Sequence, residues 1–529
     1  MMAKQRRGRR WLYVLVILAL VGVFSSGAKA QEEAAKGWAV EFHGFVESNV
    51  VVRDQNGIQN GFMDHLDAIQ QRNTLKFDVD VDPGLAWESF SLAKIHLTYR
   101  GAYDSIFDLR KGAYGDIDNK GGPSRFDYGK RDIKYENDLR EAFVDLTYTG
   151  PMGVAFFRPG RQIVSWGEVS GATILDVINP PDNSFQMFFQ NPDDLKIPLW
   201  MGRFNYSPPT LPGAVKLNFD LLFIPDIRPA QFGPLDSSME APYVSITAFS
   251  KLKGLNVRQD VPTDEREYGG KLTADIGERL SVSLVYFRDV DNDAAIKLTD
   301  FFFTPVGLFP RTAFIVHPKE HVYGAYLSYN FTPLNIVIRG EFGRQTNAVI
   351  TGGTLSQKVV LGQPVLPFGP KMETQAYRLK PVTQWMIGVD KPGVWIKWLF
   401  PHDPVSLGFQ WIHKMINQWD HDLEVAKNNT KVPVSAAPAR NLDLFSFSLN
   451  GYWWSGKLNP NIAIFYSPEG GGKGGGSWMT RGSLQWDFTP HLYMALTAQY
   501  FLGNNKSRNG YANFIDNCSE TSYKIGYQW

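Results

Sequence analysis

The sequence predicts an all-β fold, a transmembrane antiparallel β-barrel of about 18 strands within a range of roughly 16 to 20. Three observations support this prediction: a final segment that alternates apolar and polar side chains, further segments with the same alternation, and connections between them that are alternately short and long. No stretch after residue 30 is apolar enough for a helical membrane span, so any crossing must be made by strands.

The C-terminal segment alternates most clearly. From Thr521 to Trp529, Thr, Tyr, Ile, Tyr and Trp fall on one face, and Ser, Lys, Gly and Gln fall on the other. Successive side chains of a strand point to opposite faces, so this pattern fits a strand between lipid and a wet lumen. A terminal aromatic residue with apolar partners at every second position also resembles the signal read by the barrel-assembly machinery. We therefore expect that machinery to be a partner through the strand that ends at Trp529.

Other segments repeat the alternation along the chain. In one of them, residues 215–223, Val, Leu, Phe, Leu and Phe oppose Lys, Asn, Asp and Leu, as expected for a strand with one wet face. We predict strands at 38–52, 71–81, 90–101, 138–149, 154–165, 197–207, 214–224, 266–276, 279–289, 321–331, 334–344, 382–391, 404–414, 442–455, 460–467, 477–488, 491–502 and 519–529. The high aromatic content, 14%, suits a barrel with aromatic girdles at both membrane interfaces.

The connections between these strands alternate in length. Residues 276–279, 331–334 and 488–491 are tight turns, whereas 102–137, 225–265, 290–320, 345–381 and 415–441 are long. Short periplasmic turns and long extracellular loops produce this alternation, together with an even number of strands. A barrel of this size leaves an aqueous lumen. A soluble β-sandwich or propeller is the alternative architecture, although no fixed-period repeat of propeller blades is present.

The N-terminal 30 residues read as a secretory signal peptide. A basic region from Lys4 to Arg10 precedes an apolar run, Trp11 to Phe24, and the small-residue site Ala28 to Ala30. An uncleaved membrane helix is the alternative, but the run is shorter than the roughly 20 residues that a span needs. We expect residues 31–529, starting at Gln31, to form a single barrel domain in the outer membrane of a Gram-negative-type cell.

Composition excludes several function classes. Six of the 54 Lys and Arg residues lie in residues 1–30, so the mature chain carries 48 basic against 53 acidic residues, which argues against a nucleic-acid partner. The one cysteine, Cys518, excludes a disulfide framework, a redox pair of cysteines and haem attachment. We expect no cofactor and no metal site.

Residues 138–206 carry a set of motifs. They are L-R-E-A-F-V-D-L from Leu139, R-P-G-R-Q-I-V-S-W-G-E from Arg158, D-V-I-N-P-P-D from Asp176 and I-P-L-W from Ile197. This stretch resembles an outer-membrane barrel family called domain of unknown function 1302. The resemblance implies export or uptake of hydrophobic solutes, sometimes beside an inner-membrane pump system. Many members have Asp where Val169 or Ser170 stands here, so that carboxylate is missing from this chain.

The loop 166–196 is the candidate pore constriction. It holds Glu168, Asp176, Asp182, Asp193 and Asp194 beside Phe185, Met187, Phe188 and Phe189. Acids that enter a confined lumen need basic partners, because an unpaired buried charge is costly. The predicted pore residues are Arg140, Glu141, Arg161, Glu168, Asp176 and Arg203, with Glu168 and Asp176 meeting one of the arginines. A break at Pro159–Gly160 is expected to form a bulge that re-aims Arg161. The alternative is a surface loop whose acids are solvated.

Two further connections are unusually apolar. Residues 301–310 and 359–368 gain several kcal/mol by burial, at about 25 cal/mol per Å². Packed over a wall of mixed charge, they favour a passive channel for moderately hydrophobic or aromatic small solutes. The wall residues we expect are Lys94, Lys216, Asp220, Lys271, Asp275, Arg339, Glu341, Arg481 and Asp487. A general or ion-selective porin is the first alternative.

An enzyme is the second alternative. The nine histidines are scattered, and Pro318 between His317 and His321 argues against a helical metal pair. No serine has a G-x-S-x-G context. We therefore predict no catalytic residues and no enzyme activity, while a lipase-like Ser/His pair on the lipid face stays open.

Overall fold

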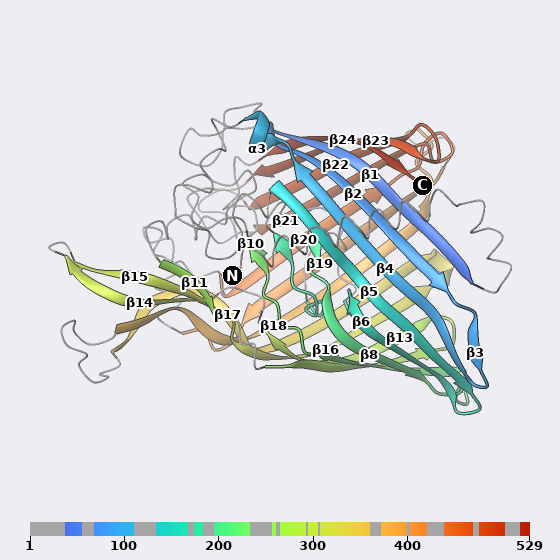
Figure 1. Ribbon diagram of the computed structural model, residues 1–529, viewed down its shortest axis with the longest axis horizontal. Helices are drawn as coiled ribbons and strands as arrows, with labels where there is room; N and C mark the ends of the chain where they lie inside the picture. The colour runs from blue at the N-terminus through green and yellow to red at the C-terminus, as the bar shows by residue number, and fades with distance from the viewer. Residues whose placement is uncertain are drawn as a thin grey trace, which may run out of the picture.

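The computed structural model describes residues 38–54, 68–110, 134–167, 174–183, 195–232, 256–260, 265–291, 295–304, 307–359, 372–398, 403–420, 439–468, 476–502 and 519–529. Within these ranges, 18 strands close an antiparallel barrel, as the sequence predicts (Figure 1). The predicted signal peptide, residues 1–30, lies outside the described residues, as do Glu168 and Cys518. Among the described residues, no helix has both the length and the apolar character of a membrane span.

Each barrel strand matches one predicted segment. In order they are β1 (Ala39–Arg53), β2 (Ala68–Asp82), β4 (Phe90–Asp104), β5 (Tyr135–Gly150), β6 (Gly153–Gln162), β8 (Leu199–Ser207), β9 (Val215–Ile224), β12 (Glu267–Ile276), β13 (Leu280–Val290), β16 (Lys319–Phe331), β17 (Ile336–Val359), β18 (Met372–Val394), β19 (Val405–Ile416), β20 (Asn441–Asn450), β21 (Leu458–Ser467), β22 (Ser477–Asp487), β23 (Leu492–Leu502) and β24 (Glu520–Gln528). Each strand pairs with the next one, and β1 pairs with β24 to close the sheet.

Smaller elements lie in the connections. The short β3 (Leu85–Trp87) pairs with β4, and the 3-10 turn η2 (Thr332–Leu334) joins β16 to β17. At the opposite end are α3 (Ile106–Leu109), the two-residue strands β7 (Asp182–Asn183) and β10 (Gln231–Phe232), and β11 (Asn256–Asp260). The tight turns therefore share one end of the barrel, and the long connections share the other.

The region 290–320, predicted to be a loop, contains strands. β14 (Ala295–Thr304) and β15 (Gly307–Val316) form a hairpin, which β11 joins in parallel to β15. Two pairs link β14 to β18, and β17 and β18 run far beyond their predicted ends (Figure 1, left). Residues 301–304 and 307–310 of the apolar run therefore pair with each other in a hairpin that extends the sheet away from the barrel mouth. Of the second apolar run, residues 360–368 lie outside the described residues.

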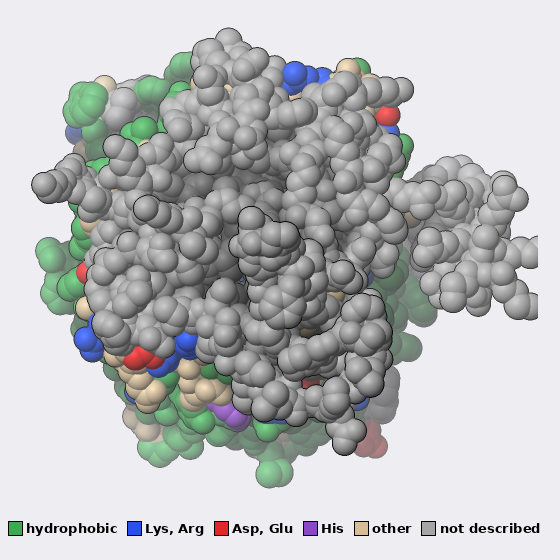
Figure 2. All heavy atoms as spheres, turned by 90° about the vertical axis from the view of Figure 1, so that its left-hand side faces the viewer, with side chains coloured by type: hydrophobic (Ala, Val, Ile, Leu, Met, Phe, Trp, Pro, Cys, Tyr) green, Lys and Arg blue, Asp and Glu red, His purple; other side chains and the backbone are tan. Residues whose placement is uncertain are grey.

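The outer face of the barrel is apolar. On β24, Tyr523, Ile525 and Tyr527 are about half exposed, whereas Lys524 points inward and its Nζ lies 3.1 Å from a carboxylate oxygen of Glu47. Figure 2 looks at the end with the long connections, and hydrophobic side chains lie around its outer circumference. Such a surface belongs in lipid, as the predicted alternation requires.

Aromatic rings mark both ends of this outer face. Near the long connections, neighbouring rings on five successive strands lie 4.3–6.5 Å apart, namely Trp385, Trp411, Phe445, Tyr466 and Trp478. Near the tight turns, the ring of Trp486 lies 5.5 Å from the ring of Trp454 and 5.5 Å from that of Phe488. These rows are the girdles typical of the two membrane interfaces.

Candidate pore site

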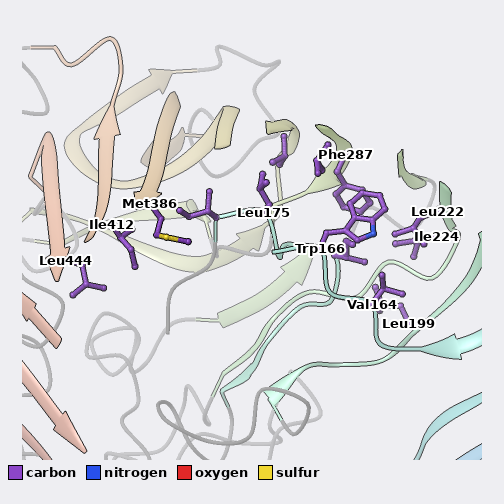
Figure 3. Close-up of a cluster of buried hydrophobic side chains, with 14 of the residues drawn as sticks. Val164, Trp166, Leu175, Leu199, Leu222, Ile224, Phe287, Met386, Ile412 and Leu444 are labelled. Carbon is purple, nitrogen blue, oxygen red and sulfur yellow. The ribbon is translucent and has the colours of Figure 1, made fainter. Parts of the chain in front are cut away.

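The connection from β6 to β8 enters the barrel. We call its described part, residues 163–167 and 174–183, the inner segment. Five of its apolar side chains are at most 2% exposed, namely Val164, Trp166, Ile174, Leu175 and Ile178. They belong to one cluster with wall residues from ten barrel strands (Figure 3).

Two glycines make room for this segment. On β16, exposed Tyr323 and Leu327 face outward, so Gly324 faces inward between them. Gly343 lies directly opposite it on β17. A Cβ atom on Gly324 would lie 2.2 Å from a Leu175 methyl, and one on Gly343 would lie 2.6 Å from an Ile174 methyl. The inner segment therefore presses on the bare backbone of the inner wall.

Trp166 is the largest fully buried side chain of the segment. Its ring meets Phe287 edge-on, with 6.0 Å between centroids, and Lys271 Nζ lies 5.9 Å from its centre. Its Nε1–H donates to Asp220 Oδ2 over 3.1 Å, and Asp220 also accepts two hydrogen bonds from Arg203 over 2.9 Å each. This carboxylate therefore ties the segment to the wall of β8 and β9.

Asn179, from the D-V-I-N-P motif, fastens the base of the segment. Its Oδ1 accepts from the Val164 N–H over 2.8 Å, and its Nδ2 donates to the Ile197 carbonyl over 2.9 Å. Leu175, which precedes Asn179 in the chain, donates its N–H to Glu341 Oε1 on β17 over 2.9 Å. Buried backbone groups need such partners, and here the side chains of Asn179 and Glu341 supply them.

The predicted pore residues lie near the base of this segment. Glu141 accepts from the Ile163 N–H over 2.9 Å. Arg140 donates to the Lys196 carbonyl over 2.5 Å. Arg161 binds Asp138 over 2.7 Å, and Arg203 binds Asp220.

Asp176 forms an ion pair with Lys196 over 2.5 Å. Lys196 is not one of the predicted pore residues. Lys196 lies 20 positions downstream, and the isolated bridge between Pro181 and Lys196 brings it back beside the acid. The pairing of Glu168 lies outside the described residues.

The predicted bulge at Pro159–Gly160 is wrong. The register of β5 with β6 is the same on both sides of the break, from Leu146 opposite Phe157 to Phe143 opposite Gly160. The extra residue is in β5, where Thr98 faces Glu141 and Tyr99 faces Leu139, which leaves Arg140 as the bulged residue. The proline removes a backbone donor without adding a residue, so the strand keeps its phase.

Sequence reasoning missed an apolar row on the inner wall. Side chains at most 6% exposed follow one another across six strands, and we call them the apolar row: Met386, Ile412, Leu444, Phe465, Met479 and Phe501. Met386 lies opposite Ile412, and Ile412 opposite Leu444. Figure 3 shows this line continuing from Leu175. A signal was present, since each of these residues adjoins an outward apolar residue and so interrupts the alternation.

Ion pairs join much of the charged inner wall. Arg158 binds Asp145 through two hydrogen bonds, and Lys94 binds Asp80 over 2.8 Å. His96 also binds Asp80, over 2.5 Å, and Arg339 binds Asp390 over 2.6 Å. Among the described residues, no group of three or more His, Cys, Asp or Glu side chains is arranged to hold a metal ion.

Replacing Gly343 by Ala should weaken the contact between the inner segment and the wall. The three heavy atoms nearest to the new methyl all belong to Ile174 and Leu175, so we expect the inner segment, not the barrel wall, to shift. We expect faster protease cleavage within residues 163–183 of the folded barrel. The control is Gly482→Ala, whose methyl would enter open space. Equal cleavage of the two variants would mean that the contact does not hold the segment.

Comparisons with known proteins give one sequence family and several solved structures of low similarity. The OccK5 (OpdH) structure from Pseudomonas aeruginosa has 10% identity and a TM-score of 0.45, covering 92% of this chain and 97% of that one. OccAB3 from Acinetobacter baumannii has 7% identity and a TM-score of 0.46, covering 93% and 99%. An anion-selective porin from Comamonas acidovorans has 12% identity and a TM-score of 0.37, covering 93% and 99%.

A search of curated proteins found no match. The model of the family described as protein of unknown function (DUF1302) matches residues 11–528, nearly the whole chain. The resemblance noted for residues 138–206 therefore extends over the complete barrel. The chain belongs to the DUF1302 family.

Proposed function

We propose that the protein is a passive outer-membrane channel for moderately hydrophobic or aromatic small solutes, narrowed by its inner segment. In this proposal residues 1–30 are removed on export, and residues 31–529 form one barrel domain. The strand ending at Trp529 is recognised by the barrel-assembly machinery, and outer-membrane lipid surrounds the apolar exterior. An inner-membrane pump system is a further candidate partner.

The apolar row is the main observation that supports this proposal. Inward positions of a wide barrel ordinarily bear polar side chains, which hold water in the lumen. Here six successive strands bring methionine, aliphatic and phenylalanine side chains inward at one level, and the row belongs to the same cluster as Trp166 and Leu175. An apolar layer of this kind favours a hydrophobic solute that packs among its side chains over a hydrated ion.

The ion pairs support a low affinity for small ions. Arg158 with Asp145, and Arg203 with Asp220, neutralise one another across neighbouring strands. Charges paired in this way leave little net field to attract an ion of either sign. In planar bilayers we therefore expect small, weakly selective conductance. Large conductance would favour the general porin, and hydrolysis of detergent esters would favour the lipase-like enzyme.

A double variant tests the apolar row. Replacing Met386 and Met479 by Gln keeps the side-chain length but adds an amide at two buried points of the row. In proteoliposomes, we expect influx of a neutral aromatic probe such as indole to fall at least fivefold, with ion conductance changed less than twofold. The control is Met152→Gln, at a residue that is 72% exposed in a tight turn. Unchanged indole influx in the double variant would overturn the proposed function.

A further inference from the structure

The seam between β5 and β6 is interrupted within the barrel wall. Phe143 lies opposite Gly160 and Leu146 opposite Phe157, but in this fully described pair of strands no register pair joins Val144 and Asp145 to Arg158 and Pro159. Proline has no N–H to donate. In lipid, backbone groups without partners are costly, so barrels rarely leave a ladder open.

The outer side of this seam carries small residues at Pro159 and Gly202. Pro159 lies opposite Gly202 of β8, and Val144 faces outward in step with exposed Leu146. Gly160 has φ +145°, a conformation that favours glycine, and a Cβ there would lie 2.3 Å from the Ala142 carbonyl oxygen. The backbones of β5 and β6 therefore approach closely at Gly160, and side-chain bulk is small at Pro159, while the ring of Phe157 lies beside Gly202.

The lumen side of the seam is closed by side chains instead. Arg158 bridges the interrupted pairs and binds both carboxylate oxygens of Asp145, over 2.6 and 2.8 Å. Its guanidinium carbon lies 3.9 Å from the centre of the Phe143 ring. Side-chain contacts of this kind can exchange partners without unfolding a strand, whereas a complete backbone ladder cannot.

The apolar interior reaches this seam. Met201 lies directly opposite Gly160, and Leu199 lies opposite Gln162. Both are at most 4% exposed and belong to the same cluster as Val164 and Trp166. A continuous layer of packed apolar side chains therefore leads from the inner segment to the seam.

We propose that the β5–β6 seam is a lateral portal, through which a hydrophobic solute held near Trp166 and Met201 exchanges with the membrane. This inference rests on the proposed function and adds a route to it. A solute that prefers an apolar environment gains by leaving sideways into lipid and loses by leaving along a wet lumen. The substrate class is then a neutral, membrane-soluble molecule of small cross-section.

A reversible cross-link tests the portal. Val144→Cys with Pro159→Cys, in a Cys518→Ser background, places a disulfide across the interrupted pairs. The control is Tyr148→Cys with Ala155→Cys, a directly opposed pair in the intact ladder of the same strands. Intact cells expressing each barrel receive N-phenyl-1-naphthylamine, which fluoresces once it enters the bilayer. The rate of the fluorescence rise is measured before and after reduction with dithiothreitol.

We expect the cross-linked seam to slow the fluorescence rise at least fivefold and the control cross-link to leave it unchanged. Reduction should relieve only part of the slowing, because Pro159→Cys also supplies an N–H donor. Pro159→Val, which restores an N–H donor without a cross-link, should slow it as well. If neither closing the seam nor Pro159→Val alters the rate while the parent barrel still speeds entry over cells without it, the portal is refuted and the channel stands. If the parent barrel gives no acceleration at all, the proposed function itself fails.

Discussion

Deleting residues 170–190 is expected to raise the single-channel conductance severalfold while the barrel still assembles. The deletion removes Ile174, Leu175 and Ile178, which are buried against the wall, together with Asn179, which fastens the segment. What remains of the connection joins β6 to β8, two strands that pair directly along their length. The measurement is conductance of purified protein in planar bilayers, with assembly checked by resistance to denaturation in cold detergent.

A matched deletion separates this effect from a general loosening of the barrel. Removing residues 423–436 shortens another long connection, between β19 and β20, which also pair directly. That variant should conduct like the parent. If deleting residues 170–190 leaves the conductance unchanged, the inner segment does not narrow the pore. The constriction is then refuted, and the barrel fold is the part of the proposal that remains.

Replacing Arg203 by Gln is expected to destabilise the barrel by about 3 kcal/mol, because it leaves a buried carboxylate without its cation. Asp220 is 1% exposed and receives two hydrogen bonds from Arg203 and one from Trp166. The remaining indole N–H cannot compensate a full charge. The measurement is the free energy of unfolding in urea, with the barrel in lipid vesicles.

Two comparisons make this result specific. Arg228→Gln breaks a more exposed ion pair, with Asp226, and should cost less than about 1 kcal/mol. Replacing both Arg203 and Asp220 by Leu removes the buried charges together and should recover most of the lost stability. Equal losses in Arg203→Gln and Arg228→Gln would show that Asp220 is solvated in the lumen.

The barrel could be predicted from sequence because the alternation within each strand shows which side chains face lipid and which face the lumen. On β24 the alternation of Tyr523, Lys524 and Ile525 corresponds directly to lipid and lumen faces. The hairpin of β14 and β15 could not be recognised in this way, since neither face of an extension beyond the membrane needs to alternate. Its apolar run 301–310 resembled a loop that must be buried.

The pore site was harder to predict than the wall. Arg161 and Arg203 were predicted as partners for Glu168 or Asp176, but they bind Asp138 and Asp220 on neighbouring strands. The fold within the connection brings Lys196 to Asp176, and no periodic pattern records such a contact. Gly324 and Gly343 reveal their role only when Leu175 and Ile174 are seen against them.

The closing pair of strands has a consequence for how the chain folds. Thr521 donates a hydrogen bond to Asp54 from 467 positions away, and the backbones of Trp529 and Gly44 exchange two more. Contacts this distant in sequence form slowly, because the whole intervening chain must first be ordered. Until then the sheet has two open edges, which can pair with another chain. The interval before closure is therefore when this protein is most exposed to misassembly, and the closed ring has no edge left to offer.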